Sequence, residues 1–149
     1  MNNQEKMFCI DDLMSELHFY INQELQNSGK PHIEAETYPY AEGETYWIDA
    51  DRERLRQVFV ILLDNAVKYI ERGFIVFGYF AGETNVIDFF VDDTRFTRMR
   101  KYDDEDLSIA RGLLEQMGSQ LIGQQHKYVG SSFSFAVEGA TKFVEIASQ

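Results

Sequence analysis

The chain has 149 residues, a length that suits one globular domain with its own hydrophobic core. Its residues are 44% hydrophobic and 14% aromatic, which excludes a disordered chain. The formal net charge of −11 excludes a surface that attracts nucleic acid or anionic membranes by charge. The single cysteine, Cys9, excludes an internal disulfide and suits a reducing compartment. We therefore expect one domain over residues 1–149, with no signal peptide and no membrane-spanning segment.

The N-terminal third of the chain predicts one helix and two short strands. Residues 10–28 read as a helix whose apolar side chains share one face, namely Ile10, Leu13, Leu17, Tyr20, Ile21 and Leu25. The sequence Gly-Lys-Pro at 29–31 breaks it. Residues 32–38 alternate in the manner of a strand, and residues 46–48 indicate a second short one.

The next element is a helix that Asp49 or Asp51 can cap and that Gly73 is expected to end. One apolar stripe consists of Leu55, Phe59, Leu62, Ala66 and Tyr69. An adjoining stripe contains Val58, Ile61, Asn65 and Lys68. Packing gives no reason for an asparagine there. The simplest interpretation is a surface polar residue, beside an Asp64–Lys68 pair four residues apart.

The second half of the chain predicts two strand pairs around a third helix. Strands are expected at 74–80 and 86–91, with a hairpin turn between them. Residues 93–105 are charged and irregular, and 106–117 read as an amphipathic helix that Gly118 ends. A closing pair of strands is expected at 119–125 and 131–137. The tail TKFVEIASQ is either a last short strand or a disordered end. This order predicts an α+β fold, a two-layer sandwich with helices on one face of a sheet.

Eleven residues of the second helix region also match a known motif in place, namely Asp51, Arg54, Leu55, Gln57, Val58, Leu62, Leu63, Asn65, Ala66, Lys68 and Tyr69. The segment resembles the N-box of sensor histidine kinase ATP-binding domains, which share the GHKL superfamily with gyrase. The likeness continues near the C-terminus through Glu115, Met117, Gly118, Gly130, Ser131, Phe133 and Phe135. The resemblance implies a Bergerat-type α+β sandwich, a mixed sheet covered on one face by about three helices.

The resemblance also implies roles for particular residues. Asn65 takes the place of the family's ligand to the magnesium ion of ATP, and Lys68 that of a cation near the phosphates. Asp93 matches the aspartate that accepts from the adenine amino group, and Thr94 matches the residue after it. The family's polar catalytic position is Ile61 here, which can neither accept a proton nor orient a water. The implied cofactor is ATP with Mg, and no catalytic residue is intact.

The glycine-rich loops of the family are altered in this chain. The first loop has side chains at both glycine positions, Arg95 and Thr97. The second has them at all three, Tyr102, Asp104 and Asp106. Four consecutive carboxylates at 103–106 lie where phosphate oxygens are expected. Like charges about 4 Å apart cost roughly 1 kcal/mol in water and more in a sheltered site. We therefore expect weak ATP binding or none.

The acidic run has a simpler interpretation as well, because Asp104 or Asp106 makes a good helix N-cap. We combine both in the hypothesis that the protein's own carboxylates occupy the anion site at this helix start. A nearby basic run either folds against those acids or forms a solvated loop; it consists of Arg95, Arg98, Arg100 and Lys101. The three histidines, His18, His32 and His126, are far apart in sequence, so no zinc site is expected.

Three functions remain open from the sequence. The favoured one is a degenerate ATP-binding domain of a two-component sensor histidine kinase, a pseudokinase that acts in signal transduction. The second is an active catalytic domain that binds Mg-ATP through a remodelled lid. The third is a nucleotide-independent interaction module. The resemblance implies a response regulator or the parent kinase's dimerisation domain as partner, and a cytoplasmic location, either alone or as part of a membrane-bound receptor. Fold alone does not choose among these functions.

Overall fold

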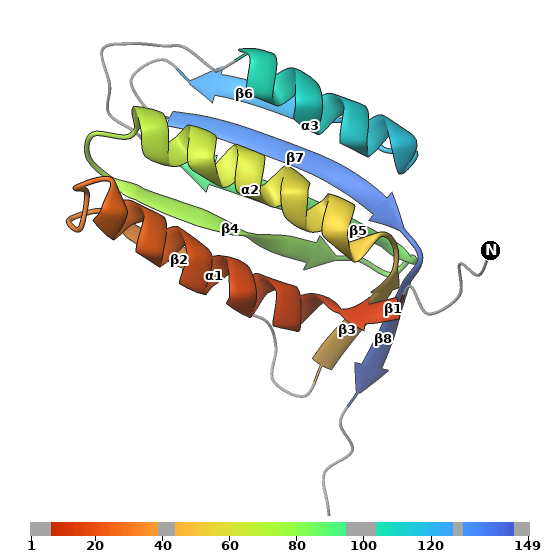
Figure 1. The fold of residues 1–149 in the computed structure, drawn as a ribbon. Coiled ribbons are helices and arrows are strands. Elements are labelled where there is room, and N and C mark those ends of the chain that lie inside the picture. Colours follow the sequence, from red (N-terminus) through yellow and green to blue (C-terminus); the bar gives the residue numbers. More distant parts are fainter. Residues whose placement is uncertain (1–6, 39–43, 95–103, 127–129, 145–149) are drawn as a thin grey trace, which may run out of the picture.

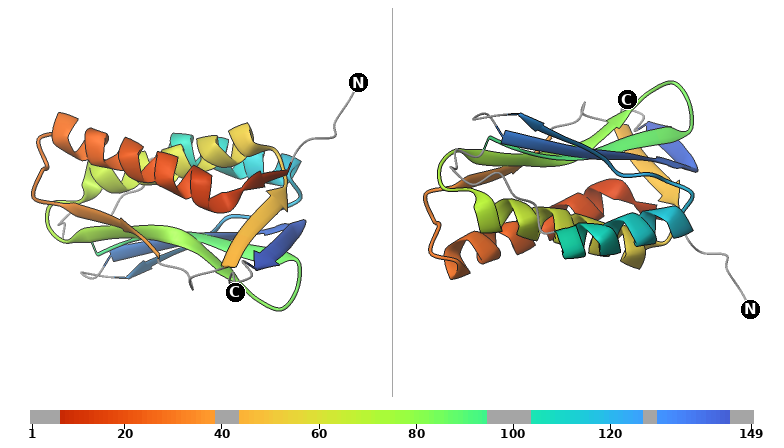
Figure 2. Two further views of the ribbon diagram at one scale, coloured as in Figure 1. Left: turned by 90° about the horizontal axis from the view of Figure 1, so that it is seen from below. Right: turned by 90° about the horizontal axis from the view of Figure 1, so that it is seen from above.

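Among the residues that the structure describes, three helices lie side by side on one face of a mixed five-stranded sheet (Figure 1). The edge-on views separate the two layers (Figure 2). This computed structural model describes residues 7–38, 44–94, 104–126 and 130–144. The predicted α+β two-layer sandwich is confirmed.

The helices are close to their predicted bounds. They are α1 (Ile10–Asn27), α2 (Arg52–Tyr69) and α3 (Asp104–Gln116). Asp51 caps α2, since its carboxylate accepts a hydrogen bond from the Arg54 backbone N–H at 3.1 Å. The start of α3 at Asp104 puts Asp106 inside the first turn, so Asp106 is not the N-cap.

The prediction that Gly73 ends α2 is wrong. The helix ends at Tyr69, and Ile70 already has an extended backbone. At this helix end the Lys30 ammonium donates to the carbonyl oxygens of Val67 at 2.6 Å and Ile70 at 2.8 Å. A cation there satisfies carbonyls that have no partner within the helix and complements its dipole.

The large sheet has the strand order β2-β4-β5-β7-β6. β2 runs parallel to β4 and all other pairs are antiparallel. Its strands are β2 (Glu34–Thr37), β4 (Phe74–Ala81), β5 (Val86–Asp93), β6 (Ile122–His126) and β7 (Gly130–Glu138). The residues at 119–121 that were predicted to open a strand precede β6.

A small second sheet of order β1-β3-β8 lies at one end of the large one (Figure 1). Its strands are β1 (Met7–Cys9), β3 (Glu44–Asp49) and β8 (Ala140–Val144). The strand alternative for the tail is confirmed by β8, and residues 145–149 lie outside the described part. β1 was not predicted.

Aromatic side chains fill the layer between helices and sheet. Phe59 of α2 is fully buried, and its ring centroid lies 5.6 Å from those of both Phe89 and Phe135. Phe77 and Tyr79 of β4 are also fully buried. Alternate residues of each strand point to this side. The helices all lie on this side as well, so the opposite side of the sheet is left without helices (Figure 2).

Candidate functional site

The residues assigned to a nucleotide lie at one end of the sandwich. Asn65 and Lys68 belong to the last turns of α2, and Asp93 is the last residue of β5. Ser131, which was not assigned to a nucleotide, is near the start of β7 and is paired with Asp93. These ends lie together, on the left of Figure 1, where α3 also begins. The topology therefore brings together segments that are up to 66 positions apart in sequence, counting from Asn65 to Ser131 (131 − 65).

Asn65 is buried, with only 3% of its surface exposed. Neither its amide nitrogen nor its amide oxygen has a hydrogen-bond partner among the described residues. The interpretation of Asn65 as a surface polar residue is therefore wrong. A buried amide without partners costs about 1–3 kcal/mol, so such groups are uncommon where they serve no ligand.

Asp93 is buried beside β7. It is 6% exposed, and its carboxylate accepts a hydrogen bond from Ser131 Oγ at 2.7 Å. Gly130 makes this contact possible. Its φ is +142°, and a Cβ at that position would lie 1.9 Å from the Asp93 carbonyl oxygen. Sequence reasoning treated Ser131 only as a fold marker, although its alternation with Phe133 placed it on the same side of the sheet.

Thr94 has a structural role at the edge of the site. Its hydroxyl accepts from the Phe74 backbone N–H at 2.9 Å, and its own N–H donates to the Phe74 carbonyl oxygen at 3.0 Å. Gly73, with φ +117°, leaves room for this contact. Thr94 thus fastens the start of β4 to the end of β5, and it fixes the backbone just after Asp93.

Carboxylates surround the outer side of α2 near its C-terminal end. Asp64, expected to pair with Lys68, accepts a hydrogen bond from Tyr20 Oη of α1 at 2.7 Å. Burial is the main cause that raises the pKa of Asp64, and the charges of Glu24 and Asp106 raise it further against the hydrogen bond from Tyr20. Lys68 is exposed, and its ammonium lies 5.4 Å from the ring centroid of Tyr69.

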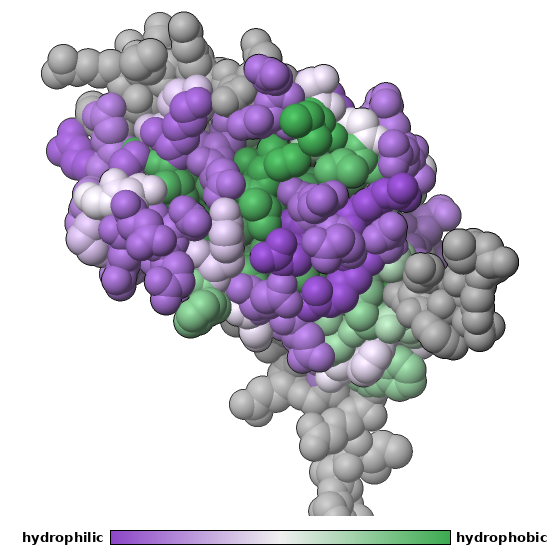
Figure 3. All heavy atoms as spheres, viewed as in Figure 1, coloured by the Kyte–Doolittle hydropathy of each residue, from purple (hydrophilic) through white to green (hydrophobic). Residues whose placement is uncertain are grey.

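Ile61 lies in an apolar groove between α2 and α3. The groove has a volume of about 260 Å³ and is lined by Arg56, Gln57, Val60, Ile61, Ile109 and Leu113. Ile109 is 54% exposed, and apolar residues gather over the seam between the two helices (Figure 3). The side chain at the family's catalytic position therefore contributes to a hydrophobic surface.

The altered loop residues are divided between the described part of the chain and the part outside it. Arg95, Thr97 and Tyr102 lie outside the described residues, as do Arg98, Arg100 and Lys101. Asp104 is the first residue of α3, and Asp106 is exposed in its first turn. The hypothesis that carboxylates occupy the helix start stays a prediction. In the described part of the chain, no three His, Cys, Asp or Glu side chains are grouped so that they could hold a metal ion.

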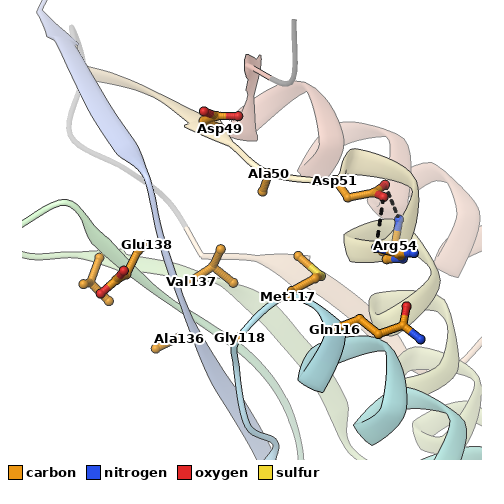
Figure 4. A pocket seen from close by; sticks show the side chains of 11 residues that line it. Asp49, Ala50, Asp51, Arg54, Gln116, Met117, Gly118, Ala136, Val137 and Glu138 are labelled. Atoms are coloured by element: carbon orange, nitrogen blue, oxygen red, sulfur yellow. Dashed lines mark hydrogen bonds and ion pairs between the residues drawn. The ribbon is translucent and has the colours of Figure 1, made fainter. Parts of the chain in front are cut away.

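A larger pocket of about 560 Å³ lies at the opposite ends of the same elements (Figure 4). It is lined by the start of α2, the end of α3 and the last residues of β7, including Asp51, Arg54, Met117 and Glu138. Arg54 and Asp51 form an ion pair of 3.7 Å in its wall. None of the residues assigned to a nucleotide lines this pocket.

Comparison with known proteins identifies the fold. No protein-family model and no curated protein sequence matches this chain. Solved structures do match. The mycobacterial sensor histidine kinase MprB is 13% identical with a TM-score of 0.69, and the match covers 89% of this chain and 96% of that one. Full-length ShkA in complex with AMPPNP is 22% identical with a TM-score of 0.68, and the match covers 93% of this chain and 31% of ShkA.

A third match is histidine kinase ThkA in complex with the response regulator TrrA, at 20% identity and a TM-score of 0.69, covering 89% of this chain and 41% of ThkA. This chain spans less than half of ShkA and of ThkA but nearly all of the MprB structure. The chain has the fold of histidine kinase catalytic domains, as the resemblance implied. No helix of the described residues is long and apolar enough to cross a membrane.

Proposed function

We propose that this chain is the ATP-binding-type domain of a two-component sensor histidine kinase in a degenerate form. It binds Mg-ATP weakly or not at all and acts in signal transduction without catalysing phosphoryl transfer. The observation that carries the proposal is Ile61, which lines the apolar groove between α2 and α3 where the family places a polar residue. A hydrocarbon side chain offers no lone pair for a proton, a water or a metal ion.

The charge around α2 supports weak nucleotide binding. Asp64 lies beside Glu24 and Asp106, whose charges already raise its pKa. A triphosphate that approached this side of α2 would meet the same negative charges. The sequence adds three acidic residues at 104–106, at the start of α3, where glycines would let backbone N–H groups contact phosphates.

One observation favours the second candidate, a domain that binds Mg-ATP through a remodelled lid. The Asn65 amide is buried without a described partner, and Asp93 is held by Ser131 in a buried position. These residues fit an adenine nucleotide. Asn65 would hold the magnesium ion, Lys68 would lie near the phosphates, and Asp93 would accept from the adenine amino group with Thr94 fixing its backbone. When bound, Mg-ATP supplies the phosphoryl group.

The proposed partners are a response regulator or the dimerisation domain of a parent kinase. The support is the fold, together with the ThkA structure, which contains a response regulator. The domain would work in the cytoplasm. A nucleotide-independent interaction module is the third candidate, and it makes the same prediction for ATP as the first.

Thermal unfolding with and without millimolar Mg-ATP tests the proposal. A ligand present at 100 times its Kd stabilises a domain by about 2.7 kcal/mol, which raises Tm by several degrees. We expect a shift below about one degree, because the negative charges on the phosphate side repel the ligand.

Asn65→Ala serves as the control. A Tm rise of several degrees that disappears in Asn65→Ala would overturn the proposal in favour of the second candidate. Titration of purified receiver domains and dimerisation domains into the protein, followed by calorimetry, tests the partner binding that the first and third candidates share. Binding to either class supports the signalling role, and binding to neither contradicts it.

A further inference from the structure

The helices leave one face of the large sheet uncovered (Figure 2). The side chains of Tyr38, Phe80 and Phe90 form an aromatic cluster on that face. Phe80 and Phe90 are stacked, with ring centroids 4.9 Å apart and planes at 24°. The ring of Tyr38 lies 4.7 Å from that of Phe80 and 6.0 Å from that of Phe90. Tyr79 and Phe89 point into the core. Successive strand residues face opposite sides of a sheet, so Phe80 and Phe90, which follow them, point away from the helices.

The cluster is preformed and open to solvent. Phe80 is 49% exposed and Tyr38 is 38% exposed, whereas Phe90 beneath them is only 7% exposed. Gly78 lies opposite Phe90 in the ladder and has no side chain to fill the space between the strands. The rings support one another, so a ligand would meet a rigid aromatic surface with little ordering cost.

Carboxylates share the outward face of the sheet with these rings. Asp88 is directly opposite Phe80 in the β4–β5 ladder, and Glu36 precedes Tyr38 by two residues on the same side of β2. Glu34, Asp92 and Glu138 occupy further outward positions of the sheet. None of the lysines and arginines that the structure describes takes an outward position of the large sheet; they are Lys30, Arg52, Arg54, Arg56, Lys68, Arg72, Arg111 and Lys142.

This charge pattern decides what can bind. A second copy of the chain would bring the same carboxylates against themselves, and nucleic acid or an anionic membrane would be repelled. A cationic group is attracted. Arginine suits the surface better than lysine, because its planar guanidinium stacks on aromatic rings and pairs with carboxylates through two parallel hydrogen bonds.

We propose that Tyr38, Phe80, Phe90, Glu36 and Asp88 form a docking surface for an arginine-bearing segment of another protein. An arginine side chain lies over the Phe80 ring, and its guanidinium pairs with Asp88. Apolar side chains of the segment cover the remainder of the cluster. This surface is on the side of the sheet opposite the helices, so the proposed nucleotide site and the docking surface can be tested separately.

The test uses the whole chain and a defined probe, a capped peptide in which arginine alternates with leucine. Calorimetry gives Kd, and two-dimensional amide NMR locates the contact. We expect shifted amide signals in β2, β4 and β5. Phe80→Ser should weaken binding about tenfold, and Asp88→Asn should weaken it several-fold. A peptide with lysine for arginine should bind more weakly.

Matched variants on the helix side control for nonspecific attraction to an acidic protein. Phe19→Ser removes a ring that is 68% exposed on α1, and Asp12→Asn removes an exposed charge there. Neither should change Kd by more than about twofold. The proposal would be overturned if Phe80→Ser and Phe19→Ser changed Kd equally and Asp88→Asn and Asp12→Asn also changed it equally. If the amide signals of β2, β4 and β5 shifted with protein concentration in the absence of peptide, the surface would bind a second copy of this chain and the proposal would be overturned.

Discussion

Asn65 buries an amide for which the described residues offer no hydrogen-bond partner. Its neighbours on the same helix, Leu62 and Ala66, are fully packed apolar residues, so an apolar side chain would suit the position. A polar group kept at a cost to stability is typical of a binding position, where function outweighs packing. Ser131 and Asp93 show the opposite arrangement, since each satisfies the other.

Replacing Asn65 by leucine should therefore stabilise the protein by about 1–2 kcal/mol, because the unpaired amide is removed and apolar contacts are gained. Urea unfolding measures the difference. Asn22→Leu, at an exposed position of α1, is the control and should change the free energy of unfolding by less than about 0.5 kcal/mol. A loss of stability in Asn65→Leu would show that the amide has a partner beyond the described residues.

Asp64→Asn should make the protein more stable than the native chain at neutral pH. The folded-state pKa of Asp64 is raised, chiefly by burial and also by Glu24 and Asp106. Its contribution to stability is therefore complete below the ordinary aspartate pKa of about 3.9 and is lost as pH rises through the raised value. Urea unfolding measures the free energy of unfolding of both proteins from acid to neutral pH. The advantage of Asp64→Asn over the native chain should increase with pH and then become constant.

Tyr20→Phe provides the matching control for Asp64. The hydrogen bond from Tyr20 lowers the pKa of Asp64, so its removal should raise that pKa further and move the pH dependence upward. If the difference in free energy of unfolding between the native chain and Asp64→Asn did not change with pH, the raised pKa of Asp64 would be contradicted.

At the scale of elements, β7 and β5 meet so closely that their contact depends on one glycine. A Cβ at Gly130 would lie 1.9 Å from the Asp93 carbonyl oxygen. The closeness places Ser131 against Asp93 and thus couples the ladder to the candidate site. Lys30 has a similar part at the other end of the sequence, because it joins the turn after α1 to the end of α2.

Gly130→Ala should destabilise the protein by at least about 2 kcal/mol, since the strands must separate and φ is +142°. Gly112→Ala in α3 is the matched control. A Cβ there meets nothing within 4 Å, and alanine favours the helix by about 1 kcal/mol. Chemical denaturation of both variants gives the comparison. Equal effects would mean that β5 and β7 are less close than described.

For the whole molecule, local patterns in the sequence predicted the three helices and most strands of the large sheet. They worked where apolar residues recur at a helical or strand period, as in α1 and β7. β1 was missed because a strand of three residues is too short to show an alternation of apolar and polar side chains. The end of α2 was misplaced, and the contact that satisfies its last carbonyls comes from Lys30, which is 37 residues from Val67. A contact of that kind follows from the tertiary fold and leaves no local signal.

The candidate site was predictable only in part, for the same physical reason. The pattern of apolar residues along the helix gave no packing reason for an asparagine at position 65. The resemblance supplied a role for Asn65. The burial of Asn65 and the Ser131–Asp93 hydrogen bond depend on how α2, β5 and β7 are brought together. The charges of Glu24 and Asp106 around Asp64 likewise come from α1 and α3.

The edge position of β2 has a consequence for the protein's local opening. β2 has only four residues and a single neighbouring strand in the sheet, β4. Segments with few neighbours open first, so the backbone amides of β2 should exchange with solvent sooner than those of β5, which is paired on both sides. Glu36 belongs to β2 and Tyr38 directly follows it, so a ligand that holds both would slow that exchange and stiffen one edge of the sheet.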